Sequence, residues 1–365
     1  MRVLALALVL ASVFNPVAGI AQTRDLIPAS RFILSPGTDL PGGDIASIFD
    51  TTQEACERAC ATNTRCTAFT YNTRNGSCFP KAEPGEPMIY QGAVSGTLLR
   101  ADPSVAAAAP ARRAELEFLG DYDLSRALDQ AQGIGKLHPA TGASVDELLA
   151  EAAVMEANGG AVRAMILTGT AVAVTDLATD WHDYARRSLL ASSADRNRQR
   201  EYRDRAVEAA TNAYLRAGSP AQRHTILVTM AEALETIGRG RDMVGALRLA
   251  QSLQSRDDTA AMLEVAIGKY GFRIVEHDMQ SDSANPRLCA TFSEDLVQSG
   301  VDYAPFVQLP EANLTVETGG SRQLCVAGIT HGQRLTVTFR EGLPAADGQT
   351  MAKSVPITAY VRDRT

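Results

Sequence analysis

The chain has 365 residues, with 42 acidic against 35 basic side chains, a formal net charge of −7 and a pI of about 5.4. An acidic chain is repelled by phosphate backbones, so this balance argues against a nucleic-acid-binding protein. The character of the sequence changes near residues 101 and 271, which predicts three regions behind a short leader.

The leader is MRVLALALVLASVFNPVAGIAQ, and its order of residues predicts a signal peptide. A single charge at Arg2 precedes an apolar run over residues 3–14, and the small residues Gly19 and Ala21 suit a signal peptidase. We expect cleavage after Ala21, so that residues 1–21 are removed. The run is too short to cross a bilayer, and no cysteine follows it at a lipid-anchor position. We therefore expect a periplasmic or secreted protein without a membrane span.

Four of the six cysteines lie together in QEACERACATNTRCTAFTYNTRNGSCFP, residues 53–80. An exported chain meets an oxidising environment, in which paired cysteines persist as disulfides. The stretch has no C-x2-C knuckle, and no histidine precedes residue 101, as a zinc site of common type would require. Disulfides are therefore favoured, and a four-cysteine zinc site is the alternative.

The same stretch predicts a short helix followed by a strand. Thr51 or Thr52 is expected to cap the helix, which places Cys56 and Cys60 on one helical face. CTAFTYN alternates and is rich in β-formers, so we expect it to form a strand under that helix.

Residues 24–100 contain DLPGGDIASIFDTTQEACERACATNTRCTAFTYNTRNGSCFPK and AVSG, and they resemble a PAN/Apple domain. The resemblance implies nested disulfides, Cys60 with Cys66 and Cys56 with Cys78. The third bridge of some Apple domains has no cysteines here, so the domain is similar to the shorter PAN variant. Each closed loop is expected to contribute about 2 to 4 kcal/mol, which a domain of about 75 residues needs because its core is small.

The PAN resemblance implies a domain that binds a protein or glycan ligand. The candidate contact residues are Arg65, Tyr71, Arg74, Lys81 and Tyr90, which we expect to be exposed. An ordinary solvated face is the simpler interpretation, since these side chains form no chemically distinctive pattern.

ADPSVAAAAPARRAE begins at residue 101, and its proline and alanine content without large apolar residues predicts a linker at residues 101–114. Residues 115–270 are alanine-rich, free of cysteine and periodic at helical spacing, so we expect several amphipathic helices. Paired helices with short turns resemble a tetratricopeptide-like solenoid, and a compact helical domain is the alternative.

Several helix boundaries are legible in this region. Ser144 and Glu147 form a capping-box pattern, and Ser219 with Pro220 is typical of the start of another helix. AVRAMILTGTAVAVTDLA is apolar on nearly every side, so we expect it to be the most buried helix.

Two clusters in the helical region suggest sharper functions. DRNRQREYRDR carries five arginines, but acidic residues interrupt them, so a solvated helix face is favoured over nucleic-acid binding. DWHDY places His182 between two aspartates, but a second set of ligands at helical spacing is missing, so a surface or packing histidine is favoured over a metal site. We expect no nucleic-acid partner, no metal and no cofactor.

Residues 271–365 read as short strands separated by turn signals: FRIVEHDMQ, RLCATFSE, ANLTVET, RQLCVAG, QRLTVTFRE and SVPITAYVRD. About 95 residues of this kind predict one antiparallel β-sandwich. Cys289 and Cys325 lie in two of these strands and are the remaining cysteines, so we pair them. The predicted fold is a multidomain α+β protein with a PAN/Apple domain, a helical region and a C-terminal sandwich.

YGFRIVEHDMQSDSANPRLCATFSEDL and LTVTFREGLPAADGQT resemble the first macroglobulin-like domain of bacterial alpha-2-macroglobulin family proteins. Some members carry a PAN module and a helical region ahead of that domain. The resemblance implies a protease trap, in which a bait segment is cleaved and a thioester within a Cys-x-Glu-Gln motif tethers the protease. Cys289 is followed by Ala-Thr-Phe and Cys325 by Val-Ala-Gly, so this sequence lacks the motif.

We therefore expect the non-catalytic N-terminal segment of an alpha-2-macroglobulin-like protease inhibitor, as part of a longer protein or as a truncated gene product. It would contact protein or carbohydrate and meet target proteases through the full-length protein. A free-standing secreted PAN-domain adhesion module is the alternative, and the sequence that follows Thr365 would separate the two.

Enzyme motifs are missing from the sequence: G-x-S-x-G, H-E-x-x-H, the Walker A loop and S-x-x-K. The histidines lie in different regions of the chain, at His138, His182, His224, His277 and His331. We expect no catalytic residues and no enzymatic activity, and a hydrolase assembled from distant residues is the alternative.

Overall fold

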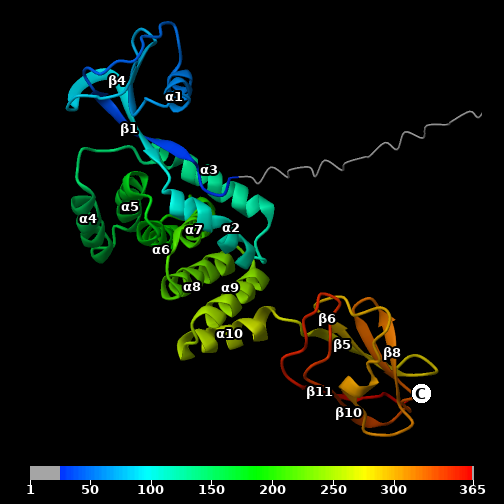
Figure 1. Ribbon diagram of the computed structural model, residues 1–365. Coiled ribbons are helices and arrows are strands. Elements are labelled where there is room, and N and C mark those ends of the chain that lie inside the picture. The colour runs from blue at the N-terminus through cyan, green and yellow to red at the C-terminus, as the bar shows by residue number, and fades with distance from the viewer. Residues whose placement is uncertain (1–24, 364–365) are drawn as a thin grey trace, which may run out of the picture.

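The computed structural model describes residues 25–363, so the expected signal peptide at residues 1–21 lies outside the described residues. The fold is multidomain α+β, as predicted: a four-stranded sheet at residues 30–100, helices at residues 103–270 and two further sheets at residues 274–360. Figure 1 shows the helices between the first sheet and the last two. Within residues 25–363, no helix is both long and apolar enough to cross a bilayer.

The N-terminal module, residues 30–100, is an antiparallel sheet with one helix packed on it. Its elements are β1 (Ser30–Asp39), α1 (Gln53–Ala61), β2 (Ala68–Asn72), β3 (Ser77–Lys81) and β4 (Met88–Arg100), with strand order β1-β4-β2-β3. Thr52 caps α1 by accepting a hydrogen bond from the Ala55 N–H, which confirms one of the two expected caps.

Disulfides make up much of the core of this module. Cys56 and Cys60 are fully buried on α1 and pair with Cys78 of β3 and with Cys66, the pairs that the PAN resemblance implies. Phe69 and Leu34 are the other buried members of this cluster. So small an apolar core gives limited stability, and the covalent links add to it by restricting the unfolded chain.

The helical region runs from residue 103 to residue 270. Its helices are α2 (Pro103–Glu115), α3 (Asp121–Leu137), α4 (Val145–Ala157), α5 (Ala161–Thr175), α6 (Ala178–Ala194), α7 (Gln199–Arg216), α8 (Pro220–Thr236), α9 (Gly240–Leu253) and α10 (Asp257–Tyr270). From α4 to α10, each helix packs against the next one in the chain, as a tetratricopeptide-like arrangement requires (Figure 1). The first two helices of the region, α2 and α3, pack on α7.

The predicted linker at residues 101–114 is wrong, because α2 occupies that stretch. Asp102 caps the helix by accepting from the Ser104 N–H at 2.7 Å, and Pro103 supplies the first turn. Alanine is the strongest helix former, and its small side chain lets α2 lie close to α7. Ala109 is buried, and the Arg112 guanidinium donates to the Leu215 carbonyl at 2.7 Å.

The expected caps are present, but the most buried helix is a different one. Ser144 and Glu147 form the predicted capping box, and Ser219 caps α8 ahead of Pro220. Twelve residues of α7 are buried against nine of α5. The difference arises because α7 contacts α2, α3, α6 and α8, so even its polar side chains lie inside the bundle.

The C-terminal region is the predicted antiparallel sandwich. One sheet has the order β5-β6-β9-β8 and the other β11-β10-β7. The strands are β5 (Ile274–Gln280), β6 (Arg287–Phe292), β7 (Val307–Gln308), β8 (Thr315–Gly320), β9 (Gln323–Ala327), β10 (Arg334–Phe339) and β11 (Val355–Tyr360). The short strand β7, which follows a 3-10 turn at Ala304–Phe306, was not predicted.

Aromatic contacts and one disulfide hold the sandwich together. Phe292 of one sheet packs edge to face on Phe339 of the other, with ring centroids 5.9 Å apart. Cys289 and Cys325 face each other on the neighbouring strands β6 and β9 and form the third disulfide, the predicted pair. All six cysteines of the chain are therefore paired.

Candidate functional site

The start of β4, residues 88–92, forms an exposed apolar segment that we call the β4 tip. Met88, Ile89 and Tyr90 leave 59%, 93% and 45% of their surfaces exposed. The tip arises because β4 has 13 residues and β2 has five, so the pairing of the two strands ends at Asn72 opposite Ala93. On its other side the tip pairs with the end of β1, where Met88 lies opposite Asp39.

The turn between β2 and β3 holds the tip in place. The backbone N–H and the hydroxyl of Thr73 donate to the Gly92 carbonyl at 2.8 and 2.9 Å. Gly92 has a φ of 101°, and a Cβ there would lie 2.6 Å from the Arg74 Nε, so glycine is required. The Arg74 guanidinium lies 5.6 Å from the centroid of the Tyr90 ring in a cation–π contact.

A second exposed aromatic residue is anchored to the same turn. Phe49 is 64% exposed and lies two residues before Thr51, whose N–H donates to the Gly76 carbonyl at 3.0 Å. The Tyr71 hydroxyl donates to the Thr51 carbonyl at 3.0 Å. Because Thr51 and Gly92 bind opposite ends of one turn, Phe49 and the β4 tip belong to the same end of the module.

The structure brings some of the predicted contact residues together and separates others. Arg74 and Tyr90 meet at the β4 tip, and Tyr71 braces the loop that carries Phe49. Arg65 is exposed in the loop before β2, at the opposite end of that strand from the tip.

The expectation that Lys81 is exposed is wrong, since only 3% of its surface is accessible. The segment before α1 runs antiparallel along β3, with Asp44 opposite Lys81. The Lys81 ammonium forms an ion pair with Asp44 and donates to the Gly42 carbonyl at 3.3 Å. Met88 and Ile89 were missed. Their signal in the sequence is an uncharged, apolar run directly after the polar, turn-forming KAEPGEP.

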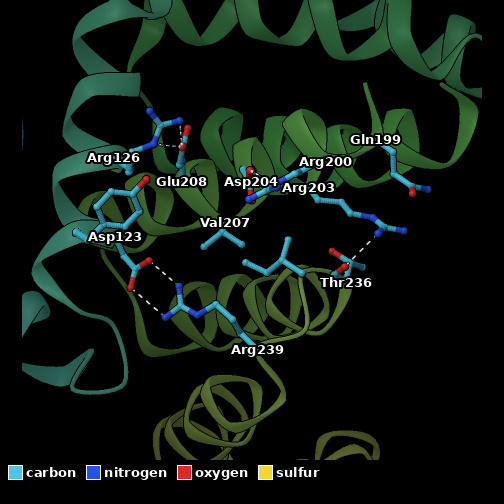
Figure 2. Close-up of a pocket in the computed structure, with 12 residues that line it drawn as sticks. Asp123, Arg126, Gln199, Arg200, Arg203, Asp204, Val207, Glu208, Thr236 and Arg239 are labelled. Carbon is cyan, nitrogen blue, oxygen red and sulfur yellow. Dashed lines mark hydrogen bonds and ion pairs between the residues drawn. The ribbon is translucent and has the colours of Figure 1, made fainter. Parts of the chain in front are cut away.

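A charged groove lies between α3, α7 and the end of α8 (Figure 2). It has a volume of about 540 Å³, and its lining includes Arg126, Arg200, Arg203, Glu208 and Arg239. Most of these arginines are already paired. Arg126 Nε donates to Glu208 at 2.9 Å, and the Arg203 guanidinium donates to the Thr236 carbonyl at 3.1 Å.

Arg239 in the same groove forms a two-pronged contact with Asp123, with distances of 2.5 and 3.0 Å, and this contact raises the pKa of the guanidinium. Burial raises the pKa of the Glu208 carboxyl although Arg126 opposes the shift. These ion pairs join neighbouring helices, so the groove is accounted for by the packing of the helical region.

The arginines at the start of α7 are likewise engaged in contacts with neighbouring side chains. Arg198 and Arg205 both pair with Glu201 at 2.6 Å, and both guanidinium groups lie over the Tyr202 ring. Arg205 is buried because it lies on the side of α7 that faces the bundle. The prediction of a solvated face is therefore wrong for this arginine.

The histidines are separate from one another. His138 Nε2 lies 2.7 Å from the Tyr184 hydroxyl, and burial lowers its pKa to about 3. His182 contacts Thr229, and His224 contacts Thr259. In the part of the chain that the structure describes, no group of three or more metal-ligating side chains is arranged to hold an ion.

Comparison with known proteins identifies the first module. The PAN domain family matches residues 30–101, which are the strands and the helix that carry the β4 tip. A crystal structure of native alpha-2-macroglobulin from Escherichia coli, spanning domains MG0-NIE-MG1, is similar with 18% sequence identity and a TM-score of 0.23. That alignment covers 26% of this chain and 32% of the other, about a third of its length. The comparison with curated proteins found no match.

Proposed function

We propose, from the premise that residues 30–101 form a PAN domain, that the chain is a non-catalytic binding protein that contacts a protein or carbohydrate ligand through this domain. The β4 tip carries the proposal, because it is an exposed apolar segment next to a cation on the domain's outer end. Single exposed apolar residues are ordinary, but a contiguous group of them marks an interaction site. Arg74 and Tyr90 are the contact residues, and no cofactor takes part.

The finer proposal is that this binding serves an alpha-2-macroglobulin-like protease inhibitor. Its support is the sequence resemblance of residues 271–365 to a macroglobulin-like domain and the order of a PAN module, helices and a sandwich. The chain contains neither the Cys-x-Glu-Gln motif nor an evident bait segment, so any trapping would belong to further domains of the full-length protein. A free-standing PAN-domain adhesion module remains the second candidate, favoured by the outward position of the β4 tip.

Export is part of the proposal. Three disulfides require an oxidising compartment for their formation, and residues 1–21 have the order of a signal peptide. The mature protein, analysed without reduction by mass spectrometry, is expected to contain no free thiol. Modification of any cysteine by iodoacetamide would contradict the three-bridge scheme.

Binding can be tested with the mature chain on a glycan array and against a panel of purified proteases. The double variant Arg74→Ala, Tyr90→Ala should weaken any interaction found by about tenfold or more, since paired aromatic and arginine side chains carry much of the energy at interfaces. Arg65→Ala is the matched control at the other end of β2. If Arg65→Ala alone removes binding, the ligand contacts the opposite end of the domain.

Incubation with serine, cysteine and metalloproteases tests the non-catalytic, non-trapping assignment. We expect neither turnover of an ester or peptide substrate nor a covalent band on a denaturing gel. A protease-linked band that methylamine abolishes would refute the absence of trapping chemistry, because methylamine consumes thioesters.

A further inference from the structure

The β4 tip is an open strand edge. The backbone hydrogen bond from Thr73, in the turn after β2, to the Gly92 carbonyl marks the end of the pairing between β2 and β4, and β4 continues past it to Met88. In the described part of the chain, no strand pairs with residues 88–91 on the side away from β1. Backbone N–H and C=O groups on that side are available to another chain.

The other edges of the same sheet are protected, and the tip is not. The segment before α1 covers β3 through bridges from Asp44 to Lys81 and from Ile48 to Cys78. On the outer side of β1, the Ala140 N–H donates to the Leu34 carbonyl at 2.7 Å. Natural proteins blunt edges with charges, prolines or such covers. The tip sequence MIYQG contains neither a charge nor a proline.

The side chains around the tip also indicate the chemistry of an occupant. Ile89, the most exposed of them at 93%, lies next to Tyr90 in sequence, so the two project to opposite faces of the strand. Arg74 lies over the Tyr90 ring, and none of the described ion pairs includes it. A cation without a carboxylate beside an apolar edge favours a ligand that brings a carboxylate with it.

We propose that the open edge of the β4 tip, flanked by exposed Ile89 and by Arg74 over Tyr90, binds an extended segment of a partner protein as an added β-strand. The segment carries apolar side chains at alternate positions and an acidic side chain that faces Arg74. Main-chain hydrogen bonds to residues 88–91 supply affinity, and the alternating side chains supply specificity. This inference rests on the proposed binding function and names the class of partner.

The test uses the mature full-length chain and an immobilised array of random peptides of about eight residues, a little longer than a typical strand. The peptides bound best should alternate apolar residues and contain Asp or Glu. The tightest one, synthesised and titrated by fluorescence anisotropy, should bind Ile89→Asp about tenfold more weakly or worse. Val265→Asp, at a position 70% exposed on α10, is the control and should bind as the unmodified protein does.

N-methylation of the peptide separates strand addition from loose apolar contact without changing the protein. Methyl groups on alternate amides block one edge of the peptide, and methyl groups on the intervening amides block the other. Strand addition uses a single edge, so one pattern should abolish binding and the other should leave it nearly intact. Binding that survives both patterns would overturn the inference.

Two further outcomes distinguish the inference from the proposed function. If no peptide binds better to the unmodified chain than to Ile89→Asp, the added-strand inference is wrong. If no peptide binds at the tip but a glycan binds the domain, the proposed binding function holds and the added-strand inference fails. If the unmodified mature chain binds neither a peptide, a protein nor a glycan, the proposed function itself is wrong.

Discussion

The helical region meets its two neighbours in different ways. At the junction with the PAN domain, Arg31 of β1 is buried, and its guanidinium donates to Asp176 at 2.6 Å and to the Val172 carbonyl at 2.8 Å. Asp176 also accepts from Arg216 at 2.9 Å and from the Trp181 indole at 2.8 Å. This junction is therefore a buried polar network that spans two regions of the chain.

The junction with the sandwich contains ion pairs that are mostly exposed, and only the Glu294 side chain, at 15%, is largely buried. Lys353 and Glu264 are 2.8 Å apart, with 70% and 69% of their side chains exposed, and Arg241 forms an ion pair with Glu294. Water and salt screen such pairs, whereas a buried charge that loses its partner is left without solvation. We infer that the PAN domain is fixed to the helices as one unit, so that the β4 tip keeps a constant orientation relative to them. The sandwich is held more loosely.

Removal of the shared carboxylate should have the largest effect on this comparison. Asp176→Ala leaves Arg31 and Arg216 buried without their anion, and we expect a loss of about 3 to 5 kcal/mol in unfolding free energy. Chemical denaturation followed by tryptophan fluorescence measures it, since Trp181 belongs to the network. Glu264→Ala, at the exposed junction, is the control. Equal effects of the two variants would show that the junctions do not differ.

Two glycines of α3 give a matched pair for the close approach of helix and sheet. A Cβ at Gly135 would lie 2.1 Å from the Phe32 carbonyl oxygen of β1, whereas a Cβ at Gly133 meets nothing within 4 Å. Gly135→Ala should therefore cost about 1 to 3 kcal/mol, as overpacking does. Gly133→Ala should be neutral or stabilise the helix by up to about 1 kcal/mol. A harmless Gly135→Ala would mean that the sheet does not rest on α3.

The buried His138 should make the stability of the helical region depend on pH. Its pKa in the folded state is about 3, below the ordinary 6.5, because burial disfavours the charged ring. The contribution of the neutral His138 ring to the free energy of unfolding is therefore complete above pH 6.5 and is lost as the pH falls from 6.5 towards 3. The expected slope is about 1.4 kcal/mol per pH unit within that window.

Denaturation curves between pH 7 and pH 5 measure this slope, which His138→Gln should reduce. Burial also lowers the pKa of His182 and His224, so part of the slope should remain in the variant. An unaltered slope in His138→Gln would mean that the ring is solvated.

Local signals explain what the sequence predicted well. The capping box of Ser144 and Glu147, the cap at Thr52 and the alternating strands of the sandwich depend on neighbours within a few residues. The disulfide pairs followed from compartment, the PAN resemblance and the number of cysteines. Alanine content misled the prediction of a linker at residues 101–114, because small side chains that look too weak for a core are suited to close helix packing.

Long-range pairing explains what the sequence did not predict. Arg31 and Asp176 are 145 residues apart, so nothing near either residue announces their ion pair. The exposure of Ile89 depends on β2 being shorter than β4, and the burial of Lys81 depends on a segment that runs antiparallel along β3. Each of these features is set by which strands meet, and local pattern does not specify that.

The smallest effect is expected at the sandwich junction. Lys353→Ala removes an exposed ion pair, so the midpoint of chemical unfolding should stay unchanged. If the ion pair restricts the motion of the sandwich, Lys353→Ala should broaden the distribution of distances between spin labels placed on α10 and β11. High salt should broaden the same distribution in the unmodified protein, because salt screens the pair. Labels placed on β4 and α3 should keep a narrow distribution under the same conditions, since buried pairs are screened little. If the first distribution were as narrow as the second at high salt, the sandwich would be fixed by packing, and the contrast between the two junctions would not hold.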